Sequence, residues 1–192
     1  MRKVIFLCVL MMTLLPLSGC GEGQKALDEA LTVRTEYLAL TNFSTQAQIR
    51  ADYGQRVYDF TLDVSARDDE MTLTVVEPEL IAGVTARLGK DSAALEYDGV
   101  SMETGPLTPE GLTPMSAVPT LLEVIRGTYI TACSYEEDGA LRVACGDPDA
   151  PVGTGVEYLL FFHPDTHDLT RAEISLDGAR RLQCTFSPFT KE

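Results

Sequence analysis

The chain is short of basic residues. Its 192 residues include 15 lysines and arginines against 29 aspartates and glutamates, which gives a formal net charge of −14 at pH 7. A surface of that sign repels phosphate groups, so the composition argues against a nucleic-acid partner. It also disfavours electrostatic attachment to anionic lipid head groups. Any attachment to a membrane must therefore have another basis.

Catalytic motifs are missing as well. The sequence has no Gly-x-Ser-x-Gly, no His-Glu-x-x-His and no phosphate-binding glycine loop. The two histidines, His163 and His167, stand in one short stretch, which disfavours a Ser-His-Asp arrangement. Residues 163–168 contain the ligand types of a metal site, yet they equally suit a five-residue hairpin connection. We predict a turn there, no catalytic residue, no metal and no cofactor, and therefore no enzyme.

Cysteines are few, and no two of them have the Cys-x-x-Cys spacing. The sequence therefore gives no support for a thioredoxin-like site or a zinc site. The five cysteines are Cys8, Cys20, Cys133, Cys145 and Cys184. The last three belong to the domain. The strands expected over 129–135 and 141–145 can pair in more than one register, and one of these registers sets Cys133 directly opposite Cys145. We predict a disulfide between these two; the alternative is a set of small buried thiols that includes Cys184.

No apolar run reaches the roughly 20 residues that a membrane-spanning helix needs. The run 4–15 follows Arg2 and Lys3 and ends before Pro16. A positive start followed by a short apolar stretch is typical of a signal peptide.

The signal peptide ends in the residues Leu17-Ser18-Gly19-Cys20, which resemble the lipobox of bacterial lipoproteins. The resemblance implies cleavage between Gly19 and Cys20 and a diacylglyceryl group on Cys20. An ordinary secretory signal with a chance cysteine is the alternative. Either reading predicts export, and the lipobox predicts an extracytoplasmic protein anchored to the cell membrane by lipid.

Removing residues 1–19 leaves 173 residues and lowers the net charge to −16, because this segment carries Arg2 and Lys3 and no acidic residue. We expect residues 20–25 to be the lipidated cysteine and a short tether, and residues 26–192 to form one domain.

The hydrophobic pattern of the domain predicts an α+β fold. A 3–4-residue period predicts a helix over 25–41, and a second helix is expected over 116–126 with Ser116 as its cap. Elsewhere the period is two, which is typical of antiparallel sheet. Turns at 54–55, 68–69 and 90–91 fix the hairpin registers, because apolar residues then face apolar ones. The predicted pairs are Ala51–Tyr58, Ile49–Phe60, Ala47–Leu62, Ala66–Met71, Val64–Leu73, Leu62–Val75, Leu88–Ala93, Ala86–Leu95 and Val84–Tyr97. Later strands are expected over 129–135, 141–145, 156–162, 169–176 and 180–186.

This order of elements resembles the LolA/LolB-like family of bacterial envelope proteins, over about 27–186. The stretch 76–84 looks like the family's strand-Pro-x-x-x-x-Gly passage, and 95–99 looks like the strand and turn after it. The resemblance implies a strongly curved antiparallel half-barrel of about nine to eleven strands. It also implies that the helices close the concave face over an apolar cavity.

A sheet face on which every second residue is apolar can line such a cavity, or it can pack against the helices as an ordinary core. The sequence leaves both alternatives open. The candidate lining residues are Tyr58, Phe60, Leu62, Val64, Leu73, Val75, Val84, Tyr97, Leu121, Leu122 and Ile125. We predict a membrane-anchored lipoprotein that binds a lipid-like or other hydrophobic ligand, with the second helix as a lid. The alternative is an interaction or sensory module, with a filled core, that binds another envelope protein.

Overall fold

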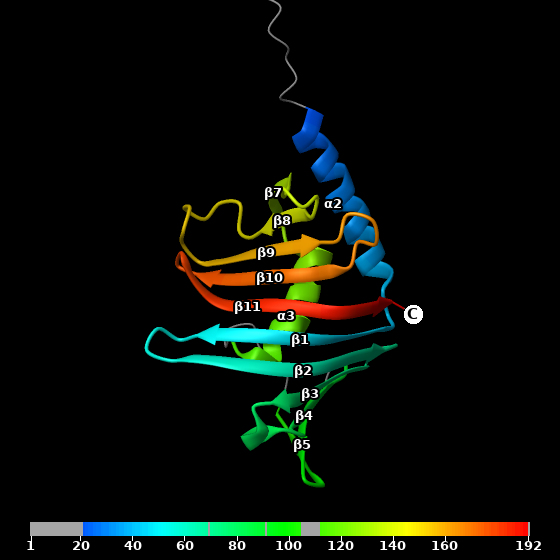
Figure 1. Cartoon of the computed structure of the whole chain (residues 1–192), viewed down its shortest axis with the longest axis vertical. Coiled ribbons are helices and arrows are strands. Elements are labelled where there is room, and N and C mark those ends of the chain that lie inside the picture. The colour runs from blue at the N-terminus through cyan, green and yellow to red at the C-terminus, as the bar shows by residue number, and fades with distance from the viewer. Residues whose placement is uncertain (1–20, 69, 91, 105–111, 192) are drawn as a thin grey trace, which may run out of the picture.

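One antiparallel sheet and two α-helices make up the part of the chain that the structure describes (Figure 1). This computed structural model describes residues 21–68, 70–90, 92–104 and 112–191. The expected signal peptide and Cys20 lie outside these ranges. The elements are α2 (Gly21–Ala39), β1 (Phe43–Asp52), β2 (Val57–Arg67), β3 (Glu70–Glu77), the 3₁₀ turn η1 (Glu79–Ile81), β4 (Thr85–Leu88), β5 (Ala93–Tyr97), β6 (Val100–Glu103), α3 (Pro114–Gly127), β7 (Ile130–Tyr135), β8 (Leu141–Cys145), β9 (Val156–Phe162), β10 (Leu169–Leu176) and β11 (Ala179–Lys191).

The sheet has the strand order β6-β5-β4-β3-β2-β1-β11-β10-β9-β8-β7. The first and last strands, β1 and β11, therefore pair near its centre, and each half of the sheet is a series of hairpins. Between them the chain passes from the edge strand β6 to the opposite edge strand β7, and α3 belongs to this crossing. Figure 1 shows α3 behind the strands, running across them.

The core lies between the sheet and the two helices. In β1 every second residue is buried, from Phe43 to Ala51, because successive side chains of a strand point to opposite faces. Helix α3 contacts β1, β9 and β11, and α2 contacts α3, β7 and β8. The largest fully buried side chains include Tyr37 from α2, Leu121 from α3 and Phe162 from β9.

The hairpin registers predicted from the sequence are confirmed. Strands β1 and β2 pair Ile49 with Phe60 and Ala47 with Leu62. The β2–β3 hairpin pairs Ala66 with Met71. The β4–β5 hairpin pairs Leu88 with Ala93 and Ala86 with Leu95 as expected, whereas Val84 precedes β4 and its expected pair with Tyr97 is not part of the ladder. The α+β class, the number of strands and the two helices agree with the prediction; the strong curvature of the sheet is not confirmed.

The helix boundaries differ from the prediction. Helix α2 begins at Gly21, so residues 21–24, expected as a tether, form its first turn. Helix α3 begins two residues early, at Pro114, and Thr113 caps it. Thr113 and Ser116 form a reciprocal capping box, in which the Thr113 side chain accepts from the Ser116 backbone N–H. The cap is therefore Thr113 and not Ser116, which is the third residue of the helix. Pro114 occupies the first helical position, where proline is favoured.

Within the described ranges, neither helix is both long and apolar enough to cross a membrane.

Candidate functional site

Most of the residues predicted to line a cavity are packed in the core. Seven of them are almost inaccessible to solvent: Leu62, Val64, Leu73, Val75, Leu121, Leu122 and Ile125. Phe60 and Val84 are half-buried, whereas Tyr58 and Tyr97 are exposed. The period-two pattern thus identified the buried face of the sheet. The middle of this face, beneath α3, is mainly ordinary core.

A groove opens beside that core, where the sheet meets the ends of both helices. Its floor is a row of apolar side chains that the strand registers place directly opposite one another. Phe43 of β1 pairs with Ala66 of β2, Ala66 pairs with Met71 of β3, and Met71 pairs with Leu88 of β4. Paired residues share a face of the sheet, so the four side chains form one continuous apolar strip.

The walls of the groove come from the helices, and it encloses about 430 Å³. Leu38, Leu40 and Thr41 contribute from the C-terminal end of α2 and the segment after it, and Pro119 and Leu122 contribute from α3. Leu38 is 59% exposed, so the groove presents a large apolar side chain to solvent. Five charged residues also line it: Asp68, Glu70, Lys90, Glu123 and Arg126. The site has an apolar floor and a charged rim, which suits an amphipathic ligand.

Two arginines hold the helices in the arrangement that forms the groove. Arg126 of α3 donates from Nε to the Tyr37 carbonyl and from Nη2 to the Leu40 carbonyl, both at 2.8 Å. Arg34 of α2 donates to the carbonyls of Ile125 at 2.7 Å and Thr128 at 2.6 Å. Each helix thus supplies a cation to the carbonyl groups at the other's C-terminal end, where the helix dipole favours positive charge.

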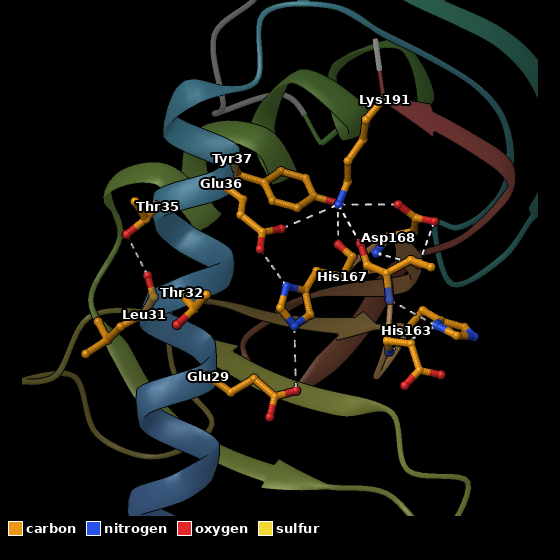
Figure 2. A network of polar contacts seen from close by, with 12 residues as sticks. Glu29, Leu31, Thr32, Thr35, Glu36, Tyr37, His163, His167, Asp168 and Lys191 are labelled. Carbon is orange, nitrogen blue, oxygen red and sulfur yellow. Dashed lines mark hydrogen bonds and ion pairs between the residues drawn. The ribbon is translucent and has the colours of Figure 1, made fainter.

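A polar network fixes the opposite side of α2 to the β9–β10 turn (Figure 2). Nδ1 of His167 lies 2.8 Å from Oε1 of Glu36, and Nε2 of His167 lies 3.9 Å from Oε1 of Glu29. Nζ of Lys191 lies 3.3 Å from Oδ1 of Asp168 and 3.7 Å from Oε2 of Glu36. The network joins the first helix, the turn 163–168 and the end of the last strand.

Tyr37 anchors this network to the core. Its hydroxyl accepts the Leu169 N–H at 2.9 Å and donates to the His167 carbonyl at 3.2 Å. Burial raises the pKa of Tyr37 above its usual value, and the carboxylates of Asp168 and Glu36 act in the same direction. Tyr135 donates to Glu29 at 2.6 Å. Its pKa rises to about 12, through desolvation first and this hydrogen bond second.

The stretch 163–168 connects β9 to β10, as the turn prediction required. The His163 N–H donates to the Asp168 carbonyl, and His167 adopts a positive φ of 55°. Within the described residues, no cluster of three histidine, cysteine, aspartate or glutamate side chains is arranged to hold a metal ion. His167 contacts Glu36 of α2, whereas Nδ1 of His163 accepts from the Asp165 N–H within the turn itself.

Cys133, Cys145 and Cys184 are free thiols in the structure. The β7–β8 register places Val143, and not Cys145, opposite Cys133, so the register that would set the two cysteines face to face is not formed. An irregularity between Ile130 and Ala132 shifts the pairing, and Cys145 lies opposite Ile130. Burial raises the pKa of Cys145 to about 11 and that of Cys184 to about 12. The disulfide between Cys133 and Cys145 stays a prediction, which a count of free thiols can test.

Leu122 is the one predicted lining residue that also lines the groove. The sequence analysis missed Leu38, Phe43, Met71 and Leu88. The signal for two of them, Met71 and Leu88, was present, because the predicted registers already aligned Ala66 with Met71 and placed Leu88 on the same face. The contribution of α2 required its position relative to the sheet, which no local pattern reveals.

No protein-family model and no curated protein matches the chain. Solved structures do. An uncharacterized conserved protein from Thermus thermophilus is similar at 8% identity and a TM-score of 0.54, over 86% of this chain and 87% of that one. A DUF1329 family protein from Desulfovibrio piger matches at 9% identity and a TM-score of 0.52, over 89% and 93%. A LolA superfamily protein from Nitrosomonas europaea matches at 12% identity and a TM-score of 0.43, over 89% and 94%. The two matches with a TM-score above 0.5 indicate a shared fold and nothing about ligands.

Proposed function

We propose that this protein is a lipid-anchored, extracytoplasmic envelope protein that binds the apolar chain of an amphipathic ligand in the groove between α2, α3 and strands β1–β4. It would act by binding and not by catalysis. The observation that carries the proposal is the groove itself, about 430 Å³ in volume with a continuous apolar floor and an exposed leucine in its wall. The LolA/LolB-like resemblance of the sequence agrees with this role.

The size of the binding energy is consistent with a reversible binder. Burial of each methylene contributes about 0.8 kcal/mol, so a dodecyl chain would contribute roughly 10 kcal/mol. Association costs at least about 4 kcal/mol in lost freedom of motion. The remainder, at most about 6 kcal/mol, corresponds to a dissociation constant of about 0.1 mM or larger for this chain length.

The proposed anchor adds a geometric consequence. Helix α2 begins at the residue after Cys20 and has 19 residues, which span about 28 Å at 1.5 Å per residue. The groove lies at the C-terminal end of this helix. A ligand in the groove would therefore be held about one helix length from the anchored end of α2.

The test is a matched pair of variants on α2. Leu38→Asp places a charge in the groove wall, and Leu31→Asp places the same charge on the same helix outside the groove; their leucines are 59% and 46% exposed. Binding of dodecyl maltoside to the full chain in lipid nanodiscs is measured by calorimetry. We expect Leu38→Asp to weaken binding at least tenfold and Leu31→Asp to leave it unchanged. Equal effects of the two variants, or no binding by the unmodified chain, would contradict the proposal.

The exposed edge strand β6 favours protein binding as a second candidate function. All four of its residues are exposed, Val100 at 69% and Met102 at 60%. An unpaired edge with apolar side chains is a template for pairing with a strand of another protein. Ser101→Pro would remove a backbone donor from this edge. Loss of an envelope partner in cross-linking experiments with this variant, but not with Leu38→Asp, would support this candidate over the first.

A further inference from the structure

The floor of the groove is a row of four apolar side chains, one from each of the strands β1–β4. Phe43 pairs with Ala66, and Ala66 pairs with Met71. Met71 in turn pairs with Leu88, and all four side chains line the groove. Neighbouring strands lie about 4.8 Å apart, so the three steps from β1 to β4 give the row a length of about 14 Å. The groove therefore has a defined length as well as a volume.

A charged side chain ends the row beyond β1. The next residue of the row is Lys191 of β11, which pairs with Phe43 and so lies on the same face of the sheet. Its Nζ lies 3.3 Å from Oδ1 of Asp168 (Figure 2) and donates to the Thr166 carbonyl at 2.8 Å. A ligand chain that extended past Phe43 would have to desolvate these polar groups, which costs free energy. The apolar floor therefore stops at Phe43.

The other end of the row opens toward solvent. Gly89 and Lys90, which follow Leu88, line the groove at this end, and Lys90 is exposed. The next residue of the row is Ala93 of β5, which is almost inaccessible and so adds no open apolar surface. The head group of a ligand would therefore lie beside Lys90, with the tip of its chain toward Phe43.

The length of the row sets the length of alkyl chain that it can cover. Carbon–carbon bonds of about 1.5 Å at angles of about 111° advance an extended chain by about 1.25 Å per carbon. A row of about 14 Å is therefore covered by about twelve carbons. Further carbons would lie beyond the floor, where they would lose little contact with water.

The volume of the groove suits one alkyl chain and not two. Non-bonded carbons approach to about 4 Å, so an extended alkyl chain is about 5 Å wide and has a cross-section of about 20 Å². Over a length of about 14 Å, one such chain fills about 290 Å³ and two parallel chains fill about 580 Å³. The groove encloses about 430 Å³. One chain fits with some space left, whereas a second chain would stay exposed to water.

We infer that the groove takes a single alkyl chain of about twelve carbons, so that its ligands are single-chain amphiphiles and not two-chain lipids. This inference rests on the proposed function, because it concerns the same groove. It adds the class of ligand and the chain length that the groove selects.

The first experiment measures affinity against chain length, with alkyl maltosides of eight, ten, twelve, fourteen and sixteen carbons. The full chain is used in nanodiscs, and calorimetry is run below the micelle concentration of each probe. Titrations into empty nanodiscs correct for partition into the bilayer. Full burial of a methylene corresponds to about fourfold in affinity, but Leu38 in the wall is 59% exposed, so a bound chain is only partly covered. We expect a gain of about two- to threefold per methylene up to twelve carbons and of less than about 1.5-fold beyond.

The second experiment compares octanoyl lysophosphatidylcholine with dioctanoyl phosphatidylcholine. The two lipids share a zwitterionic head group and differ by one chain. A second octanoyl chain buried as well as the first would raise affinity by more than about 100-fold. We expect the two affinities to agree within about threefold, because either chain of the two-chain lipid can enter the groove but only one at a time.

The variant Ala66→Leu tests the floor directly. Ala66 is the smallest residue of the row, and a leucine at this position would separate Phe43 from the other two. We expect the gain with chain length to end at about eight carbons, which matches the two steps that remain. Ala132→Leu makes the same change at an exposed residue of β7 outside the groove and should leave the limit at twelve. Circular dichroism checks that both variants fold, and Ala66→Val serves if Ala66→Leu does not.

Three outcomes would overturn the inference while leaving the proposed function intact. They are an undiminished gain per methylene from twelve to sixteen carbons, a dioctanoyl lipid that binds about 100-fold more tightly than its one-chain counterpart, and a limit that the substitutions of Ala66 leave unchanged. Failure of every maltoside to bind would instead remove the proposed function.

Discussion

Replacing Arg126 by methionine tests how the groove is held open. The side chain donates two hydrogen bonds of 2.8 Å to carbonyls at the end of α2. A hydrogen bond to a charged group contributes about 1.5–3 kcal/mol, and the interaction with a helix C-terminus about 0.3–1 kcal/mol. Arg126 is only half-buried, so solvent compensates part of the loss. We expect a loss of about 2–3 kcal/mol in the free energy of unfolding.

A domain of this size loses roughly 2–4 °C of melting temperature per kcal/mol, so Arg126→Met should melt about 4–12 °C lower. The matched control is Arg180→Met. Arg180 makes a 2.8 Å ion pair with Glu173 but is 52% exposed, and such surface pairs contribute at most about 1 kcal/mol. Melting is followed by circular dichroism. Arg126→Lys keeps the charge without the fork and should fall between the two.

The reciprocal arrangement of the two arginines allows a second test of the same prediction, by comparing single and double variants. Arg34 and Arg126 fasten the same pair of helices, so the double variant with methionine at both positions should be less destabilised than the sum of the two single variants. Equal melting temperatures for Arg126→Met and Arg180→Met, or strict additivity of the two arginines, would refute the view that they form one fastening.

Three further predictions follow from burial. Because the pKa of Tyr37 is raised in the folded chain, its neutral form adds stability that is complete below about pH 10 and is lost as the pH rises further, by up to about 1.4 kcal/mol per pH unit; urea unfolding should show a shallower decline for Tyr37→Phe. A raised pKa of about 12 protects Cys184, so iodoacetamide at pH 8 should modify the half-buried Cys133 first. A thiol count on the denatured, unreduced protein, processed and lipidated at Cys20, should find three free thiols, as in the structure; a count of one would show that Cys133 and Cys145 are joined. Leu62→Ala should lower the free energy of unfolding in urea by about 2–5 kcal/mol, because its side chain is fully buried in the core; a loss near zero would place it at an open cavity instead.

Much of the sheet could be predicted from the sequence, because local signals specify it. Period-two alternation selected the face, and the turns selected the register, as the pairing of Ile49 with Phe60 shows. The β7–β8 hairpin was less determined. More than one register kept its apolar residues on one face, and the register formed, which pairs Tyr135 with Leu141, sets Cys133 opposite Val143 and not Cys145.

The groove depended on contacts that are distant in sequence. Only the Ala66–Met71 step of its floor followed from the predicted registers, and its walls required α2 to lie against α3 with Leu38 in the groove lining. That placement is fixed by Arg34 and Arg126, whose partners lie about 90 positions away in the chain. No local sequence pattern around either arginine indicates that its side chain joins the two helices. The start of α2 at Gly21 was missed for a different reason, since its first residues have no apolar periodicity.

The most direct test of the account is an isotope-filtered NMR measurement of contacts between bound dodecyl maltoside and the methyl groups of the full chain in nanodiscs. We expect intermolecular NOEs from the dodecyl chain to the methyl groups of Met71, Leu88 and Leu38, which line the groove, and none to those of Val100 and Met102 on β6. NOEs confined to β6, or a dodecyl chain that contacts no residue of the groove, would contradict it.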